Sequence, residues 1–182
     1  MEIIKTPIEG LLVIQPRVFP DSRGYFFESY NEERYQAAGI TQQFVQDNIS
    51  SSSYGVLRGL HFQRGEHSQS KLVQVLVGKV WDVAVDLRTS SPTFGQWYGV
   101  ELSAENHTQF LLPRGMAHGF VVLSETAIFN YKCDNLYAPD FDGGIRFDSK
   151  ALNIQWPIPQ EHFILSPKDL QLPDFCEFDN PF

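Results

Sequence analysis

One histidine lies in a segment whose neighbours leave room for chemistry. His61 belongs to the run Gly55–Gln63, which is short, rich in apolar residues and typical of a β-strand. On a regular strand Arg58 would point to the opposite face from His61. Gly59 leaves space beside the imidazole for a ligand or for another stretch of backbone. By residue type alone His61 could be a structural residue, a metal ligand or a general base, since imidazole titrates near about pH 6.5.

A second histidine, His118, lies at the end of a segment that contains turn-forming residues. The run from Pro113 through Gly115 to His118 resembles the second motif of cupins, in which a histidine points into a barrel. A metal-binding cupin usually offers two histidines separated by one residue and then a glutamate in its first motif, whereas His61–Gln63 contains a single histidine. Two histidines could still hold zinc or iron, but no third ligand stands at the expected spacing. The sequence therefore disfavours a metal site, and we expect no cofactor.

Three further polar positions could take part in chemistry, and each has an ordinary alternative. Lys71 begins a predicted strand, where lysine is usually solvated. Tyr131 follows Phe129 by two residues and could be a core residue with a hydrogen-bonded hydroxyl. Asp169 comes after Pro167 and could lie in an exposed turn. Spacing alone does not connect these residues with His61.

The elements that would position these side chains are mostly strands. Turn-forming residues separate short segments that are rich in β-branched and aromatic residues. Within 79–88, Trp81, Val83, Val85 and Leu87 fall on one side, and Asp82, Asp86 and Arg88 on the other. Gly78 and Lys79 form a predicted tight turn between two strands. The predicted strands are 10–19, 24–30, 43–50, 54–63, 71–77, 79–88, 97–103, 107–112, 118–124 and 126–133.

Helices are few in the predicted structure. Asn31 can cap a short helix that ends at Gly39, a second helix could follow Asp148, and a turn could follow Pro167. Many short strands with few helices favour an antiparallel sandwich or barrel. We therefore predict an all-β fold, a cupin-type jelly roll with a few short peripheral helices.

The whole chain sets limits on organisation and partners. Its 182 residues fit one domain, 1–182, with a C-terminal tail at about 174–182. A net charge of −8 argues against broad nucleic-acid binding, although a few cations could still hold a small phosphorylated ligand. No stretch is long and apolar enough for a membrane span, no secretory signal is evident, and the two cysteines, Cys133 and Cys176, share no metal-like spacing. These features predict a cytoplasmic protein.

Taken together, the motifs are more specific than any one of them. From about residue 2 to residue 173 the chain resembles the dTDP-4-dehydrorhamnose 3,5-epimerase family, a family of metal-independent cupins. The resemblance is carried, in this order, by 19–28, 46–48, 55–63, 79–88, 91–95, 113–120, 131–139 and 168–169. It implies an isomerase whose substrate is a dTDP-linked 4-keto-6-deoxyhexose. It also implies a homodimer in which the N-terminal region of one subunit contributes to the partner's site.

Roles for individual residues follow from this resemblance. His61 matches the catalytic base, Asp169 the carboxylate that orients the base, Tyr131 the general acid and Lys71 the cation beside the ketone. Tyr137 matches a tyrosine that stacks on thymine, and Asp142 stands where the family carries glutamate. The remaining matches to substrate-binding residues are Arg23, Phe26, Glu28, Gln46, Asp47, Asn48, Arg58, His118 and Lys168.

The implied reaction inverts C3 and C5 of dTDP-4-dehydro-6-deoxy-D-glucose, giving dTDP-4-dehydro-L-rhamnose for surface polysaccharide such as the O antigen of lipopolysaccharide. A C3-only epimerase on the same substrate class is the nearest alternative. A 3,4-ketoisomerase, a non-catalytic sugar-binding cupin and a metal-dependent dioxygenase are more distant ones. The match at Tyr131 argues against the ketoisomerase.

Overall fold

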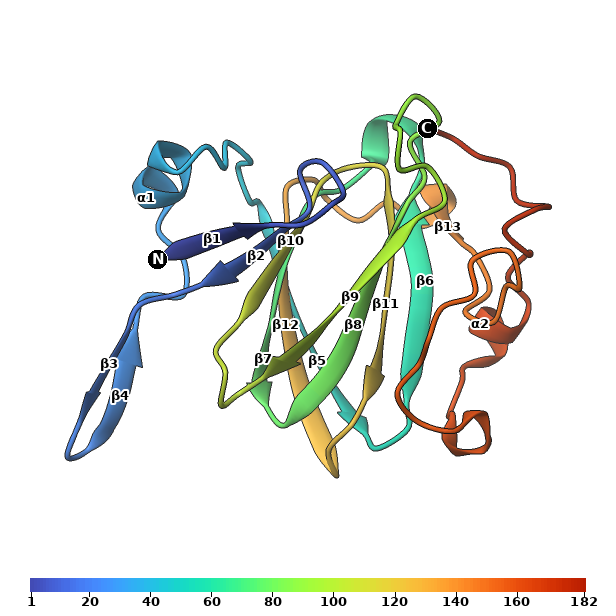
Figure 1. Ribbon diagram of the computed structural model, residues 1–182. Helices are drawn as coiled ribbons and strands as arrows, with labels where there is room; N and C mark the ends of the chain where they lie inside the picture. Colours follow the sequence, from blue (N-terminus) through green and yellow to red (C-terminus); the bar gives the residue numbers. More distant parts are fainter.

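Two antiparallel β-sheets face each other and form a flattened barrel in the computed structural model, which describes residues 1–182 (Figure 1). The six-stranded sheet consists, in spatial order, of β1 (Glu2–Lys5), β2 (Leu12–Gln15), β10 (Gln109–Leu112), β7 (Lys71–Val77), β12 (Thr126–Cys133) and β5 (Gln46–Ser53). The five-stranded sheet consists of β13 (Asp142–Gly144), β6 (Leu57–Gln63), β11 (Met116–Val122), β8 (Lys79–Asp86) and β9 (Trp97–Ser103). The predicted all-β, cupin-type jelly roll is confirmed.

A third, two-stranded sheet stands apart from the barrel. It is the hairpin of β3 (Val18–Asp21) and β4 (Gly24–Phe27), called here the arm. The arm projects from the side of the molecule that carries the N-terminus and α1 (Glu32–Ala37) (Figure 1). Phe26 on the arm is 68% exposed. The arm therefore contributes little to the core.

Each of the ten predicted segments contains or overlaps a strand, and three of them, 71–77, 97–103 and 126–133, match their strands residue for residue. The segment 10–19 is divided between β2 and β3, and β1 and β13 were not predicted. The predicted helix capped by Asn31 is confirmed, since the Asn31 side chain accepts a hydrogen bond from the backbone N–H of Arg34. Pro167 opens a four-residue helix, α2 (Pro167–Leu170), where a turn was expected.

The helix expected after Asp148 is wrong. Residues 150–153 form successive turns, and Asn153 has a left-handed φ of 47° that an α-helix does not allow. Asp148 is held by Arg146, with Nε and Oδ1 2.7 Å apart, so its carboxylate pairs with a side chain rather than capping a helix. No helix of the structure is long and apolar enough to cross a membrane.

Apolar side chains from both sheets fill one end of the barrel. This core includes Val73 and Phe129 of the six-stranded sheet and Ala84 and Phe120 of the five-stranded sheet. The tight turn at Gly78 is confirmed, but it carries the chain from one sheet to the other, because β7 and β8 belong to different sheets. A Cβ at Gly78, which has φ 74°, would lie 2.0 Å from the Thr126 carbonyl oxygen.

The outer face of the five-stranded sheet is covered by the C-terminal part of the chain (Figure 1). Phe62 on β6 contacts Phe178 and Phe182, with ring centroids 6.2 and 5.7 Å apart. The predicted apolar side of 79–88 faces this layer, since Trp81, Val83, Val85 and Leu87 all pack in it. The opposite side of β8, with Asp82 and Ala84, therefore faces the barrel interior, and both residues are fully buried.

Candidate active site

The open end of the barrel contains a cavity with two lobes of about 340 and 350 Å³. His61, Lys71 and Tyr131 line both lobes. The deeper-lying residues of the first lobe are His118, Gly119, Phe120 and Phe129, and its remaining lining comes from Ser50, Arg58, Ser166, Lys168 and Asp169. The second lobe is completed by Gln46, Asn48, Phe62, Gln63, Gln69, Cys133, Tyr137 and Asp142. The three shared residues therefore lie where the lobes meet.

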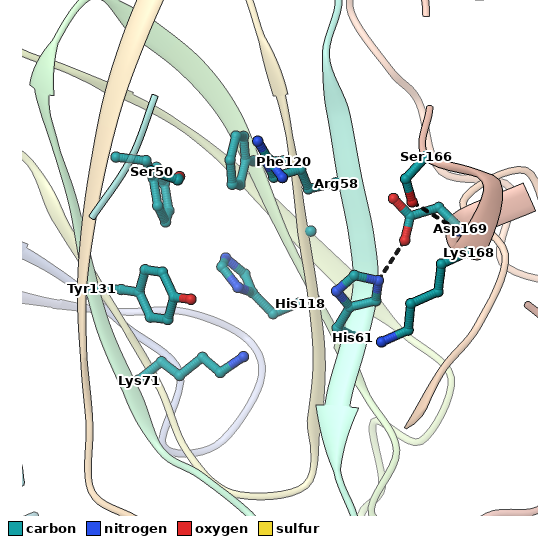
Figure 2. Close-up of a pocket in the computed structure, with 12 residues that line it drawn as sticks. Ser50, Arg58, His61, Lys71, His118, Phe120, Tyr131, Ser166, Lys168 and Asp169 are labelled. Carbon is teal, nitrogen blue, oxygen red and sulfur yellow. Dashed lines mark hydrogen bonds and ion pairs between the residues drawn. The ribbon is translucent and has the colours of Figure 1, made fainter. Parts of the chain in front are cut away.

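His61 is paired with a buried carboxylate. Its Nε2 lies 2.6 Å from Oδ1 of Asp169, whose side chain is only 4% exposed (Figure 2). Burial alone would raise the pKa of Asp169, but the hydrogen bond and charge of His61 hold that pKa below its usual value. With Asp169 ionised, Nε2 carries the hydrogen and donates it, which leaves Nδ1 as the basic nitrogen. Nδ1 points into the cavity.

Local sequence explains how Asp169 reaches this position. Ser166 caps α2 by accepting a hydrogen bond from the backbone N–H of Asp169 at 3.1 Å, and Pro167 occupies the first helical turn. The carboxylate thus sits on a short, capped turn beside β6. The exposed-turn alternative for Asp169 is wrong, because the residue is 3% exposed.

A β-bulge places Arg58 on the same side of β6 as His61. On β11, Phe120 and His118 are two residues apart, but their partners on β6, Arg58 and His61, are three apart. The extra residue shifts the alternation, so the expectation that Arg58 and His61 face opposite ways is wrong. Arg58 donates to Ser52 Oγ through Nε and Nη2, at 3.2 and 3.1 Å.

Gly59 makes the bulge possible. It has φ 126°, and a Cβ there would lie 2.5 Å from Cα of Gly119 and 2.7 Å from the His118 carbonyl oxygen. The space that Gly59 leaves is therefore filled by the backbone of β11, one of the two occupants expected from the sequence. A side chain at position 59 would push apart the two strands that carry His61 and His118.

Lys71 and Tyr131 come from the opposite sheet. Figure 2 shows both side chains on one side of the cavity and His61 with Asp169 on the other. Lys71 Nζ lies 5.9 Å from the centre of the Tyr131 ring. Burial lowers the pKa of Lys71 and raises the pKa of Tyr131. The solvated-lysine alternative for Lys71 is thus wrong, since its amine projects into the barrel.

His118 forms a second pair with a carboxylate that the sequence analysis did not select. Its Nε2 lies 2.9 and 3.0 Å from the two Oδ atoms of Asp82. Asp82 is 0% exposed and His118 is 9% exposed. Burial raises the pKa of Asp82, while the charges of His118 and Lys71 oppose that shift. The available signal was a charge within the interior-facing row of β8, between the apolar residues Val80 and Ala84.

Polar groups form the mouth of the second lobe. Gln46 Oε1 accepts from the backbone N–H of Tyr137 at 2.9 Å, and Gln63 Nε2 donates to Asp142 at 3.3 Å. Lys168 forms an ion pair with Asp142. Tyr137 is 52% exposed, so one face of its ring is available to a flat ligand. Asp142 therefore links the β13 edge to the lysine that precedes Asp169.

Four of the predicted substrate-binding residues lie outside the cavity. Arg23 and Phe26 are on the arm, and Glu28 follows it and pairs with Arg34 at 3.1 Å. Asp47 is on the outer face of β5, where it accepts from Lys132 Nζ at 2.6 Å. The structure brings the other predicted site residues together around the cavity. It contains no group of three or more His, Cys, Asp or Glu side chains arranged to hold a metal ion.

The fold and the site together define a class: a cupin-type jelly roll whose cavity places an imidazole–carboxylate pair opposite a tyrosine and a lysine, as an acid–base isomerase requires. The profile of the family described as dTDP-4-dehydrorhamnose 3,5-epimerase matches residues 5–177. The chain belongs to this family of isomerases.

Individual relatives are similar over almost their whole length. The dTDP-4-dehydrorhamnose 3,5-epimerase of Salmonella typhimurium is 54% identical over 174 residues, 95% of this chain and 94% of that protein. The crystal structure of the enzyme from Elizabethkingia anophelis has a TM-score of 0.93 and 57% identity, and covers 99% of this chain and 98% of its own. A structure from Legionella pneumophila in complex with dTDP-4-keto-L-rhamnose has a TM-score of 0.94 and 50% identity, with 98% and 94% coverage.

Proposed function

We propose that this protein inverts C3 and C5 of dTDP-4-dehydro-6-deoxy-D-glucose and so forms dTDP-4-dehydro-L-rhamnose. The observation that carries the proposal is the placement of His61 and Tyr131 on opposite sheets, facing one cavity that Lys71 also lines. Both carbons flank the C4 ketone, so removal of either proton leaves an enolate with its charge on the C4 oxygen. Inversion requires a base on one face of the sugar and an acid on the other.

His61 is the proposed base. The free Nδ1 faces the cavity, and the Asp169 carboxylate at 2.6 Å from Nε2 fixes the tautomer and stabilises the imidazolium that forms. The proton removed from carbon is held on Nδ1 until the ring returns it to solvent. Asp169 is in this sense a positioning residue for the base.

Lys71 is the proposed cation at the ketone oxygen. Its amine is buried inside the barrel, where a fixed charge acts more strongly than in solution. Tyr131 is the proposed acid that delivers a proton to the opposite face of the enolate. Its raised pKa keeps the hydroxyl protonated at neutral pH, as a donor must be.

The nucleotide supplies binding energy away from the reacting carbons. Gln46, Asn48 and Tyr137 line the second lobe, where Tyr137 offers a face for thymine and the amides offer hydrogen bonds. Arg58 and Lys168 line the first lobe and can pair with the diphosphate despite the acidic whole chain. His118 and Asp142 complete the proposed contacts within one subunit.

Arg23, Phe26 and Glu28 lead to a proposal about assembly. They match substrate-binding residues of the family, yet the arm carries them away from the cavity of their own subunit. We therefore propose a homodimer in which each arm reaches the partner's cavity. Asp47 points outward from β5 and would bind substrate only if such an assembly rearranged its pair with Lys132.

The cytoplasmic location and the polysaccharide that receives the sugar remain predictions from the sequence. A cytoplasmic enzyme making L-rhamnose for surface polysaccharide, including O antigen, agrees with the family membership. The single domain 1–182, with a tail from about 174, is likewise proposed. Phe178 and Phe182 of this tail pack behind the strand that carries His61.

Product analysis in heavy water tests the function. The purified protein is incubated with dTDP-4-keto-6-deoxyglucose in D₂O, and the product is analysed by NMR and mass spectrometry. Double epimerisation predicts deuterium at C3 and C5 with the L-configured product. Deuterium at C3 alone would establish the C3-only epimerase. A product with its carbonyl moved to C3 would establish the ketoisomerase, and substrate binding without deuterium exchange would establish the sugar-binding cupin.

A further inference from the structure

Behind the cavity wall lies a buried carboxylate with no place in the proton transfers described above. Asp82 projects from β8 into the barrel and is 0% exposed. Its neighbours on the same face of β8, Val80 and Ala84, are apolar and also fully buried. A buried charge is costly, and an apolar residue of similar size is often as stable or more so. Core packing alone therefore gives no reason for an aspartate at this position.

Asp82 contacts the site through His118. Both carboxylate oxygens lie within 3.0 Å of Nε2. The donors and acceptors belong to neighbouring strands of one sheet, since β8 pairs with β11 from Met116 to Val122. Nε2 therefore carries the hydrogen, and Nδ1, which has no hydrogen-bond partner in the chain, is left to the cavity that His118 lines. The orientation of this ring is set by two rigid strands.

Asp82 also acts on Lys71 from across the barrel. Burial lowers the pKa of Lys71, and three negative or potentially negative groups oppose that shift: Cys133, Asp142 and Asp82. The Cys133 thiol is neutral at working pH because burial raises its pKa to about 11. Asp142 is already paired with Lys168. Asp142 and Asp82 both support the charge of Lys71; Asp82 is the fully buried one, and it has no lysine or arginine partner of its own.

We propose that Asp82 is a positioning residue of this active site, which orients the His118 ring and keeps Lys71 positively charged where the enolate oxygen forms. The inference rests on the proposed epimerase function. Asp82 touches neither the base nor the reacting carbons. The titratable and charged groups that face this space come from both sheets, from α2 and from the loop after β12: His118 from β11, Lys71 from β7, Tyr131 and Cys133 from β12, His61 and Arg58 from β6, Asp142 from β13, Lys168 and Asp169 from α2, and Tyr137.

The pH profile of turnover is the sensitive measurement. Burial lowers the pKa of Lys71, so its charge is lost at a lower pH than that of an ordinary lysine. Burial raises the pKa of Tyr131, which keeps its hydroxyl protonated to higher pH. Loss of the Lys71 charge should therefore set the alkaline limb of kcat. Asp82→Asn keeps the size and a hydrogen-bond acceptor for Nε2–H but removes the charge. The Lys71 pKa should fall further, and the alkaline limb should move to lower pH.

The expected loss in kcat for Asp82→Asn is about 10- to 100-fold at neutral pH, less than for deleting a donor that touches the oxyanion. KM should change by less than about threefold, because the charge acts on the transition state. Asp82→Glu should restore the position of the alkaline limb. The matched control is Asp86→Asn, a buried carboxylate at the end of the same strand that binds Arg88, Ser91 and Thr93 outside the cavity. This control should lose stability without moving the limb.

Two outcomes would overturn the inference. The first is an unchanged alkaline limb in Asp82→Asn together with wild-type kcat. The second comes from ¹⁵N NMR of the wild-type histidines and needs no variant. It is the finding that the His118 ring carries its hydrogen on Nδ1 rather than on Nε2. Wild-type protein that exchanges no deuterium would instead refute the epimerase itself, so the two failures are distinguishable.

Discussion

The two histidine–aspartate pairs of the cavity contain the same groups but are built differently. His61 and Asp169 join a strand to a four-residue helix, and the imidazole is 31% exposed. His118 and Asp82 lie on neighbouring strands of one sheet, and the imidazole is 9% exposed. Burial raises the pKa of Asp82, whereas the pKa of Asp169 is lowered by its histidine. The more exposed pair, His61–Asp169, is suited to exchanging protons with a ligand. The buried pair, His118–Asp82, is suited to holding the His118 ring in one orientation and a negative charge in one place.

The largest expected effect is the loss of the exposed imidazole. His61→Ala should lower kcat by about 10²- to 10⁴-fold, the usual contribution of a positioned general base. Deuterium uptake at C3 and C5 should fall by the same factor, because the proposed mechanism assigns both proton abstractions to this ring. His118→Asn is the comparison, and it should retain far more exchange. Equal losses in the two variants, or full activity of His61→Ala, would remove the difference in role between the pairs.

The next effect concerns the carboxylate behind the base. Asp169→Asn should lower kcat by roughly 100-fold or more, since a hydrolase triad that loses its aspartate charge loses about 10⁴-fold. Ser166→Ala is the matched control on the same helix. It removes the cap of α2 at a cost of about 0.5–2 kcal/mol in stability but leaves the carboxylate in place. Steady-state kinetics and thermal unfolding of both variants separate the effect of the Asp169 charge from the effect of α2 stability. Similar kcat values in the two variants would mean that turnover depends on the position of α2 and not on the charge of Asp169.

The sequence predicted the exposed pair better than the buried one. His61 and Asp169 were selected because their motifs match the family, and all ten strand segments were located from residue type and turn signals. Asp82 was assigned to a side of its strand, but periodicity cannot say which side of a sheet faces the interior when both are buried. The bulge at Gly59 was also missed, because the extra residue is visible only against the partner strand β11.

A smaller kinetic effect tests the opposite wall. Tyr131→Phe keeps the ring packed beside Phe129 and removes only the hydroxyl. Proton abstraction by His61 should continue, while delivery from the other face slows by about 10²-fold, at the lower end for a positioned acid. Deuterium uptake should therefore exceed inversion, with deuterated starting material accumulating. If uptake and inversion fall together in this variant, Tyr131 is not the residue that converts abstraction into inversion.

The smallest expected effects are in stability, and they have opposite signs for the two pairs. The folded pKa of Asp169 lies below its unfolded value, so its ionised form contributes stability above the unfolded pKa of about 3.9 that is lost as pH falls through the folded pKa. The folded pKa of Asp82 is raised, so burial of its charge costs stability at neutral pH, and this cost disappears as pH falls below the folded pKa. Asp169→Asn should therefore lower Tm more at pH 7 than at about pH 2–3, below the unfolded pKa. For Asp82→Asn, the Tm difference from the wild type should be more favourable to the variant at pH 7 than at pH 4.

A change of about 1 kcal/mol in the free energy of unfolding moves Tm by about 2–4 °C in a chain of this size, which calorimetry resolves. The same sign of pH dependence in both variants would mean that the two aspartates are held in equivalent environments, and the division between an exchanging pair and a positioning pair would then have no electrostatic basis.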